Sequence, residues 1–103
     1  MASSLTNAQP RERHLVKEYD INGILNGTLA VPLSSLPGAK RILAAYATSK
    51  VSTVAEAQAQ QAVSALIATD GQSVTFYGWQ EDGTASATDR PFNAVVVCQT
   101  EPN

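Results

Sequence analysis

Side chains that could perform nucleophilic, acid–base or metal chemistry are scarce in this chain of 103 residues. His14 is its one imidazole and Cys98 its one thiol. A nucleophilic centre needs a nucleophile, a base and usually an acid that orients the base, and His14 follows a polar N-terminal segment that offers little support for such a site. Cys98 has no second thiol with which to form a disulfide or a metal-binding pair. Neither residue therefore predicts a catalytic or metal centre.

Carboxylates are the remaining candidates for acid–base work. Glu81, Asp82 and Asp89 all fall in a polar, turn-rich stretch, where exposure to solvent favours a solubilising role. Gly23 and Gly27 each follow an asparagine and lack the strand, spacing and helix of a phosphate-binding loop. We therefore expect no enzymatic activity, no cofactor and no metal.

The charge pattern limits the classes of partner. Seven Lys and Arg against nine Asp and Glu give a net charge of −2, without a basic run that could follow a nucleic-acid backbone. Arg11 and Arg13 form a small basic cluster with His14, diluted by Glu12. Two interpretations stay open for this cluster: a solvated face, or a contact in which Arg11 and Arg13 bind an acidic partner.

Hydropathy predicts no membrane partner. No apolar stretch approaches the roughly 18 to 20 residues that cross a bilayer, and no N-terminal secretion signal is evident. We expect a soluble protein made in a cytoplasm, with neither nucleic acid nor membrane among its partners.

The length is that of a single domain, but the expected core is thin. Two Phe, three Tyr and one Trp are the large aromatic side chains, and alanine supplies much of the apolar fraction of 44%. Ordering a backbone costs about 1 to 2 kcal/mol per residue, so a thin core favours further burial against partner chains. Residues 1–10 are small, polar and without periodicity. We expect a flexible N-terminal arm over 1–12 and one domain over 13–103.

The first third of that domain predicts little regular structure. Residues 13–19 indicate only a weak short strand, because their apolar positions are adjacent rather than alternating. Two Asn-Gly pairs, at 22–23 and 26–27, favour tight turns, and two prolines interrupt sheet pairing. We expect residues 20–39 to form a loop with one short strand around 28–31.

Stronger patterns begin at residue 40. Alternation over 40–48 predicts a strand that is at least partly covered on both faces. Thr53 and Glu56 then match a helix-capping box, and the alanines and glutamines that follow are good helix formers. Because a helix this short is marginal, residues 50–63 predict either a short helix or an ordered loop.

The clearest pattern is a β-hairpin around the Asp-Gly pair at 70–71, a favoured sequence for tight antiparallel turns. The two-residue period places Val74 and Phe76 on one face of its second strand, and Tyr77 and Trp79 on the other. The first face should fill the core. Tyr77 and Trp79 should then be covered either by a neighbouring segment or by a partner chain.

A polar loop over 80–91 separates the hairpin from the last strand. Residues 92–99 are rich in valine and predict a central strand that is buried on both faces. Cys98 is then best interpreted as a small buried hydrophobe rather than a reactive thiol.

The segments RILAAYAT, AVSALIATDGQSVTFYGW and PFNAVVVCQ, with the polar loop before the last of them, resemble the three-strand ending of small virion proteins of tailed phages. Those proteins are capsid decoration or cement proteins, and the head or tail fibre domains related to them in style. The elements that carry the resemblance are the hairpin, the aromatic strand that ends in Tyr77-Gly78-Trp79, and the valine-rich strand at 95–97.

The resemblance implies a mostly β fold, a small antiparallel β-sandwich of jelly-roll-like style. It also implies a structural virion protein on the capsid exterior, a dimer or trimer that cements contacts between subunits of the major capsid protein. The arm and the loop over 20–39 would then reach across the shell. The alternative is a receptor-binding or fibre-tip module, in which Tyr77, Trp79 and the 80–91 loop face a glycan or a host protein.

Overall fold

The computed structural model describes residues 3–13, 16–50, 53–55, 60, 62–80, 82–86 and 89–100, except for the side chains of residues 6–13. The described residues contain short helical turns and the following strands: β1 (Ser4–Arg13), β2 (Val16–Leu25), β3 (Thr28–Pro32), β4 (Ala39–Ser49), β5 (Ala62–Ile67), β6 (Ser73–Trp79) and β7 (Arg90–Thr100). A 3-10 turn, η1 (Leu33–Ser35), connects β3 to β4.

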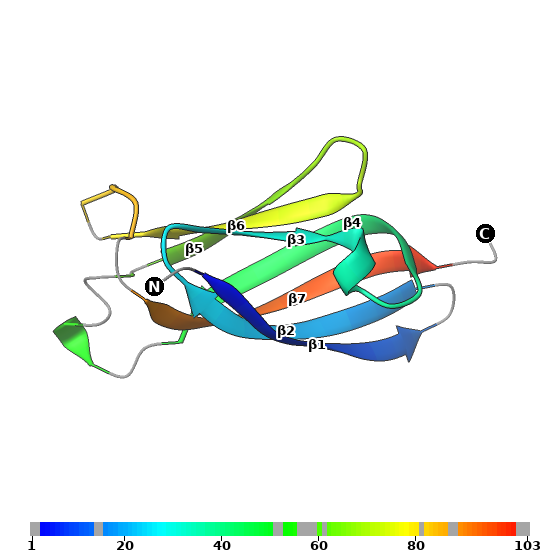
Figure 1. Ribbon diagram of the computed structural model, residues 1–103, viewed down its shortest axis with the longest axis horizontal. Helices are drawn as coiled ribbons and strands as arrows, with labels where there is room; N and C mark the ends of the chain where they lie inside the picture. Colours follow the sequence, from blue (N-terminus) through cyan, green and yellow to red (C-terminus); the bar gives the residue numbers. More distant parts are fainter. Residues whose placement is uncertain are drawn as a thin grey trace.

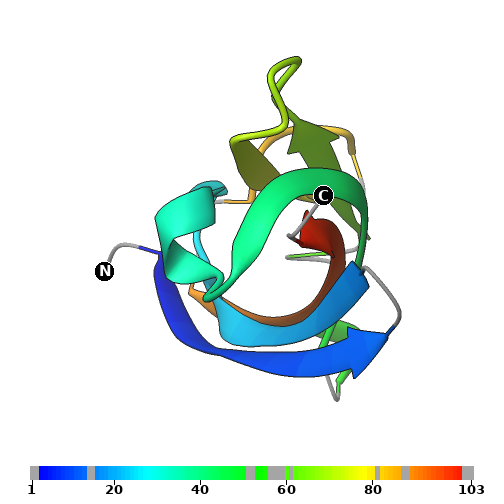
Figure 2. The same cartoon turned by 90° about the vertical axis from the view of Figure 1, so that its right-hand side faces the viewer.

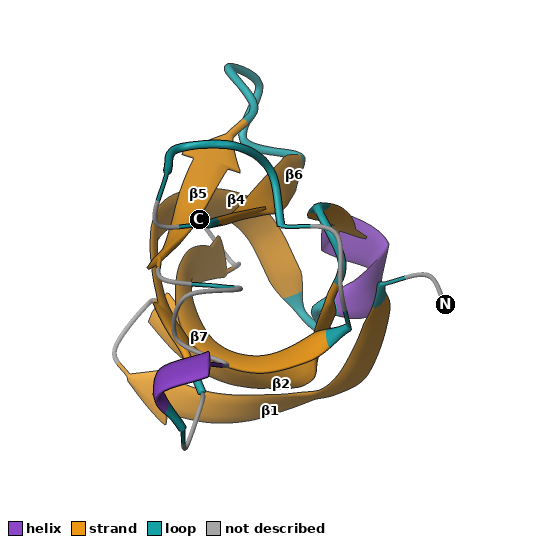
Figure 3. Ribbon diagram, turned by 90° about the vertical axis from the view of Figure 1, so that its left-hand side faces the viewer, coloured by secondary structure: helices purple, strands orange, loops and turns teal. Residues whose placement is uncertain are grey.

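These strands form two antiparallel sheets that pack face to face (Figure 1). The four-stranded sheet has the order β1-β2-β7-β4, and the three-stranded sheet has the order β3-β6-β5. A view along the strands shows the larger sheet curving around the interior, with β4 arching toward the smaller sheet (Figure 2). Figure 3 shows how strands dominate the molecule. The prediction of a mostly β, antiparallel sandwich is confirmed.

The core lies between the inner faces of the two sheets. β2 contributes the fully buried Tyr19 and Ile21. In β7, every second residue from Phe92 to Cys98 is buried. Phe76 of β6 meets Phe92 with ring centroids 5.3 Å apart and planes tilted by 50°. Such an aromatic pair adds about 0.5 to 1.5 kcal/mol beyond its buried area. This contact joins the two sheets at the centre of a small core.

The prediction of a flexible N-terminal arm is wrong for residues 4–12. These residues belong to β1, which pairs with β2 from Ser4↔Ile24 to Arg13↔Val16. Ser3 strengthens the attachment, since its Oγ accepts a hydrogen bond of 2.7 Å from the backbone N–H of Asn26. β1 is an edge strand, and edge strands are often polar as a defence against pairing with other chains. Backbone pairing therefore orders a segment whose side chains show no periodicity.

The expected loop over 20–39 is also partly wrong. Asn22 and Gly23 lie inside β2 and form no turn. Gly23 is needed for close packing, because a Cβ there would lie 2.6 Å from the carbonyl oxygen of Ser4. The second pair is the true bend: Gly27 has a φ of 82° and precedes β3, whose position matches the strand expected around 28–31.

β4 confirms the strand expected over 40–48, but its faces do not follow simple alternation. A register shift against β7 between Ile42 and Ala44 changes which residues point inward. Ile42 is buried and Ala45 packs against the core, whereas Tyr46 is 65% exposed. The bulge therefore sends the one large aromatic side chain of this strand outward.

The hairpin is confirmed as β5 and β6. Asp70 and Gly71 lie in its connection, where Gly71 has a φ of 71° and donates its N–H to the carbonyl oxygen of Ala68. Val54 and Ala55 have helical backbone, but half of the segment expected as a short helix or ordered loop, including Glu56, lies outside the described residues.

β7 is central, as expected, and lies between β2 and β4. It begins at Arg90, inside the segment expected as loop, and it is not buried on both faces. Its inward side chains are buried, whereas Asn93, Val95 and Val97 on the outer face are only half-buried. This outer face is therefore available to solvent.

Candidate functional site

The outer face of the three-stranded sheet carries two of the predicted binding residues, Tyr77 and Trp79. Strand alternation and the pairing of β3, β6 and β5 place uncharged side chains over this whole face. We call it the uncharged face, and its outward residues are Thr28, Ala30, Pro32, Ala62, Ser64, Leu66, Ser73, Thr75, Tyr77 and Trp79. Leu66 is 60% exposed and Trp79 is 36% exposed, so the chain by itself leaves apolar groups uncovered here.

Contacts on the same face hold the Trp79 ring in place. It stacks on Tyr77 with centroids 6.0 Å apart and planes within 15°. Its Nε1–H donates a hydrogen bond to Oγ of Ser64 on β5. The sequence predicted correctly that Val74 and Phe76 fill the core while the two aromatics face the other way. The sandwich buries the first pair fully but does not bury Trp79.

The loop after β6 lies against the same aromatic strand. Trp79 forms a backbone bridge with Ala85, so this loop stays close to the end of β6. The expected turn at Asp82-Gly83 is present, with a φ of 89° at Gly83. Oδ1 of Asp82 accepts hydrogen bonds from Oγ1 and N–H of Thr84, at 2.7 and 3.0 Å, and these bonds lower the pKa of Asp82. The carboxylate thus stabilises its own turn. Glu81 lies outside the described residues.

Arg11 and Arg13, the other predicted binding residues, lie elsewhere. Both are in β1, the edge strand of the four-stranded sheet, opposite Glu18 and Val16 of β2. The structure therefore does not bring the two arginines together with Tyr77 and Trp79 on one sheet. The side chains of both arginines, and the whole of His14, lie outside what the structure describes.

Cys98 is fully buried on the inner face of β7. Burial raises the pKa of its thiol from 9.0 to about 11, because a thiolate would lose its hydration there. The thiol is therefore protonated and inaccessible near neutral pH, as expected of a small core hydrophobe.

Two further structural findings apply to the described ranges alone. Across them, His, Cys, Asp and Glu nowhere form a group of three or more that could hold a metal ion. Across the same ranges, no helix is long and apolar enough to span a bilayer.

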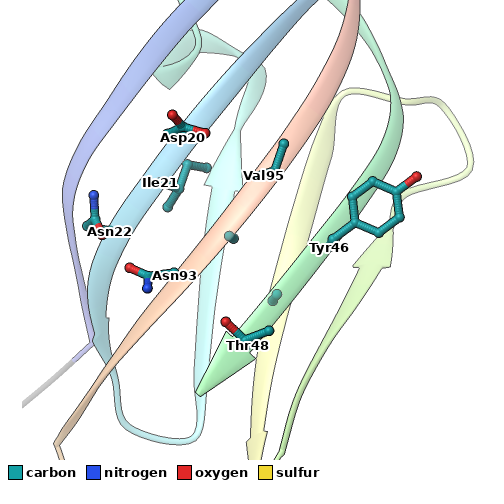
Figure 4. Close-up of a pocket in the computed structure, with 9 residues that line it drawn as sticks. Asp20, Ile21, Asn22, Tyr46, Thr48, Asn93 and Val95 are labelled. Carbon is teal, nitrogen blue, oxygen red and sulfur yellow. The ribbon is translucent and has the colours of Figure 1, made fainter. Parts of the chain in front are cut away.

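Sequence reasoning missed a groove on the outer face of the four-stranded sheet (Figure 4). Its volume is about 420 Å³, and it crosses β2, β7 and β4. Its lining residues are Asp20, Ile21, Asn22, Tyr46, Ala47, Thr48, Asn93, Ala94 and Val95. The groove could not be predicted while 20–25 was assigned to a loop and 92–99 to a strand buried on both faces. The sequence carries a signal for its β2 side alone, the polar residue at every second position, Asp20 and Asn22.

Comparison with known proteins gave no match: no family model, curated protein or solved structure is significantly similar to this chain. A functional proposal therefore depends on the two outer faces of the sandwich and on the resemblance described above.

Proposed function

We propose that this protein is a structural virion protein that binds the outside of a phage capsid and stabilises contacts between major capsid subunits. The observation that supports the proposal is the uncharged face of the three-stranded sheet, with Trp79 and Tyr77 stacked at its centre strand. The centres of protein–protein interfaces are depleted in charge and enriched in Trp and Tyr. A protein surface is the partner that this chemistry fits best.

The preset geometry of Trp79 also favours docking. Its ring is already held by Tyr77 and by the hydrogen bond to Ser64. A side chain fixed before binding loses little rotational freedom when a partner covers it, so more of the contact energy remains as affinity. The face is therefore suited to docking without rearrangement.

A capsid offers many equivalent sites, so each contact needs only modest affinity when several are made at once. A dimer or trimer of this chain would engage several shell subunits together, and the major capsid protein is the proposed partner. The proposed role involves no catalysis, no cofactor, no nucleic acid and no membrane.

The alternative proposal is a receptor-binding or fibre-tip module of a phage tail or head fibre. The position of residues 82–86 favours it, because the bridge between Trp79 and Ala85 holds them next to the end of the aromatic strand. Copy number separates the two roles. Many copies spread over the shell of purified particles support the cement role, a few copies at vertices or the tail support the fibre role, and absence from particles contradicts both.

The decisive substitution is Trp79→Ala. The side chain is outside the core, so we expect the variant to keep the fold and the circular dichroism of the wild type. Its melting temperature should fall only by the loss of the contacts with Tyr77 and Ser64. Truncation of a side chain at the centre of an interface typically weakens the binding free energy by about 2 kcal/mol or more. For the capsid this is about a thirtyfold loss of affinity. The matched control is Tyr46→Ala, which removes an exposed aromatic from the other sheet and should leave capsid occupancy unchanged. Unchanged occupancy of the Trp79 variant, or a collapse of its melting transition with no separate binding defect, would contradict this use of the uncharged face.

A further inference from the structure

A row of neutral polar side chains crosses the middle of the four-stranded sheet on its outer face. Asn22 of β2 is directly opposite Asn93 of β7, and Asn93 is opposite Thr48 of β4. Neighbouring strands are about 4.8 Å apart, so the row extends over about 10 Å. Each amide offers donors and an acceptor, and the hydroxyl offers both. The row can therefore bind groups that themselves donate and accept hydrogen bonds.

A second row, two residues along each strand, has different chemistry. Asp20 of β2 is opposite Val95 of β7, and Val95 is opposite Tyr46 of β4. Tyr46 is 65% exposed, so its ring is open to a ligand, and Val95 provides an apolar patch beside it. Two residues of a strand span about 7 Å, so the two rows are close enough for one small ligand to contact both.

The two rows line the groove described above. In Figure 4, Asp20 and Asn22 stand on β2, Asn93 and Val95 on β7, and Tyr46 on β4 across from them. The volume of about 420 Å³ lies within the usual range for small-molecule sites, which also combine apolar or aromatic walls with a few polar groups. β7 is hydrogen-bonded to both β2 and β4, so the sheet holds these side chains at fixed spacing.

We propose that this groove binds a neutral saccharide. A sugar ring presents many hydroxyl groups, which suit the amides and hydroxyl of the first row, and a face of C–H groups, which suits the Tyr46 ring and Val95. Asp20 accepts hydrogen bonds from sugar hydroxyls. Among the lining residues that the structure describes, Asp20 is the one carboxylate and none is basic, so phosphates and acidic sugars are disfavoured.

This inference goes beyond the proposed function and does not depend on it. The groove and the uncharged face belong to different sheets of the sandwich. A protein docked through the smaller sheet would leave the groove facing away from its partner. The three-stranded sheet would then attach the protein to the capsid, and the four-stranded sheet would bind sugars on a surface that the particle contacts.

The test is a titration of the free, full-length protein followed by the NMR signals of its backbone and side-chain amides. The probes are maltose, lactose, mannobiose and diacetylchitobiose, with sialyllactose as the acidic counterpart of lactose. We expect at least one neutral probe to shift the signals of Asn22 and Asn93, with a dissociation constant of about 1 mM, as befits an open site. Sialyllactose should bind no more tightly than lactose.

Variants then locate the site. Tyr46→Ala and Asn93→Ala should each weaken the binding of that probe by about tenfold or more. Val54→Ala removes an exposed apolar side chain outside both sheets and should leave the binding unchanged. Circular dichroism and melting of each variant verify that the fold is kept. The inference is overturned if none of the neutral probes shifts the groove signals at tens of millimolar, or if Tyr46→Ala binds like the wild type. Because no particle is involved, such a failure leaves the capsid proposal unaffected.

Discussion

Gly23 provides the most stringent test of the packing between β1 and β2. It has no positive φ, so its backbone would accept any residue, yet a Cβ there would lie 2.6 Å from the carbonyl oxygen of Ser4 and 2.9 Å from Cε1 of Phe92. Real Cβ atoms essentially never approach other atoms this closely. Overpacking of a well-packed core typically costs about 1 to 3 kcal/mol. Gly23→Ala causes two collisions at once, one with backbone and one with a core ring. We therefore expect it to lower the free energy of unfolding by about 3 kcal/mol.

That free energy is large for a domain of this size. A folded domain is typically stable by about 5 to 15 kcal/mol, and each kcal/mol lost lowers the melting temperature of a small domain by about 4 to 8 °C. Thermal melting followed by circular dichroism should therefore show Gly23→Ala melting about 12 to 24 °C below the wild type. The matched control is Gly83→Ala, where a Cβ would meet nothing within 4 Å and only the φ of 89° is unfavourable. Left-handed strain of about 1 to 2 kcal/mol predicts a clearly smaller effect there.

Hydrogen exchange adds a residue-level measurement to the melting curves. The chain can relieve the collision with Ser4 by releasing β1 from the sheet, and amide protection would then fall selectively over Ser4–Arg13. A Gly23→Ala variant that melts like the wild type and keeps protection in β1 would refute the close approach of the two strands.

Two further predictions concern single side chains in the core. Because burial raises the pKa of Cys98 from 9.0 to about 11, the folded state holds this proton more tightly than the unfolded state, and stability should fall as pH rises from 9 to 11. Urea unfolding at several pH values should show this fall in the wild type and a smaller one in Cys98→Ala, and equal slopes would contradict the assignment. Tyr19→Phe removes the hydrogen bond from Oη to the carbonyl oxygen of Pro37 and should lower the free energy of unfolding by about 0.5 to 1.5 kcal/mol at an unchanged urea m-value, whereas no loss would show that the bond adds nothing.

Local sequence pattern predicted those parts of the fold in which side chains themselves carry the signal. The hairpin of β5 and β6 was predictable because Val74 and Phe76 alternate with Tyr77 and Trp79 beside an Asp-Gly pair. The central position of β7 was predictable because a valine-rich strand is rarely at an edge. In both cases one-dimensional periodicity corresponds directly to the faces of a sheet.

The remaining elements depend on contacts that the local pattern does not contain. β1 forms because β2 offers it a backbone edge, and Gly23 is needed because Ser4 and the Phe92 ring come close to it. The outward position of Tyr46 depends on a register shift, since simple alternation would place it on the same face as the buried Ile42. The groove therefore depends on the long-range pairing of β2, β7 and β4, and no single segment could have predicted it.

The distribution of aromatic residues connects the thin core to the proposed binding roles. Two Phe, three Tyr and one Trp are present in the chain, and the core takes only Tyr19, Phe76 and Phe92. The others are on the outer faces: Tyr46, Tyr77 and Trp79. Fully burying such a side chain stabilises a fold by about 2 to 3 kcal/mol, a gain that the isolated sandwich obtains only in part from these three residues. They lie instead on the two opposite sheets, one beside amides and a carboxylate and the other among uncharged neighbours. Partners that cover them would supply the burial that the chain leaves incomplete, and the differing neighbours would select a sugar on one sheet and a protein on the other.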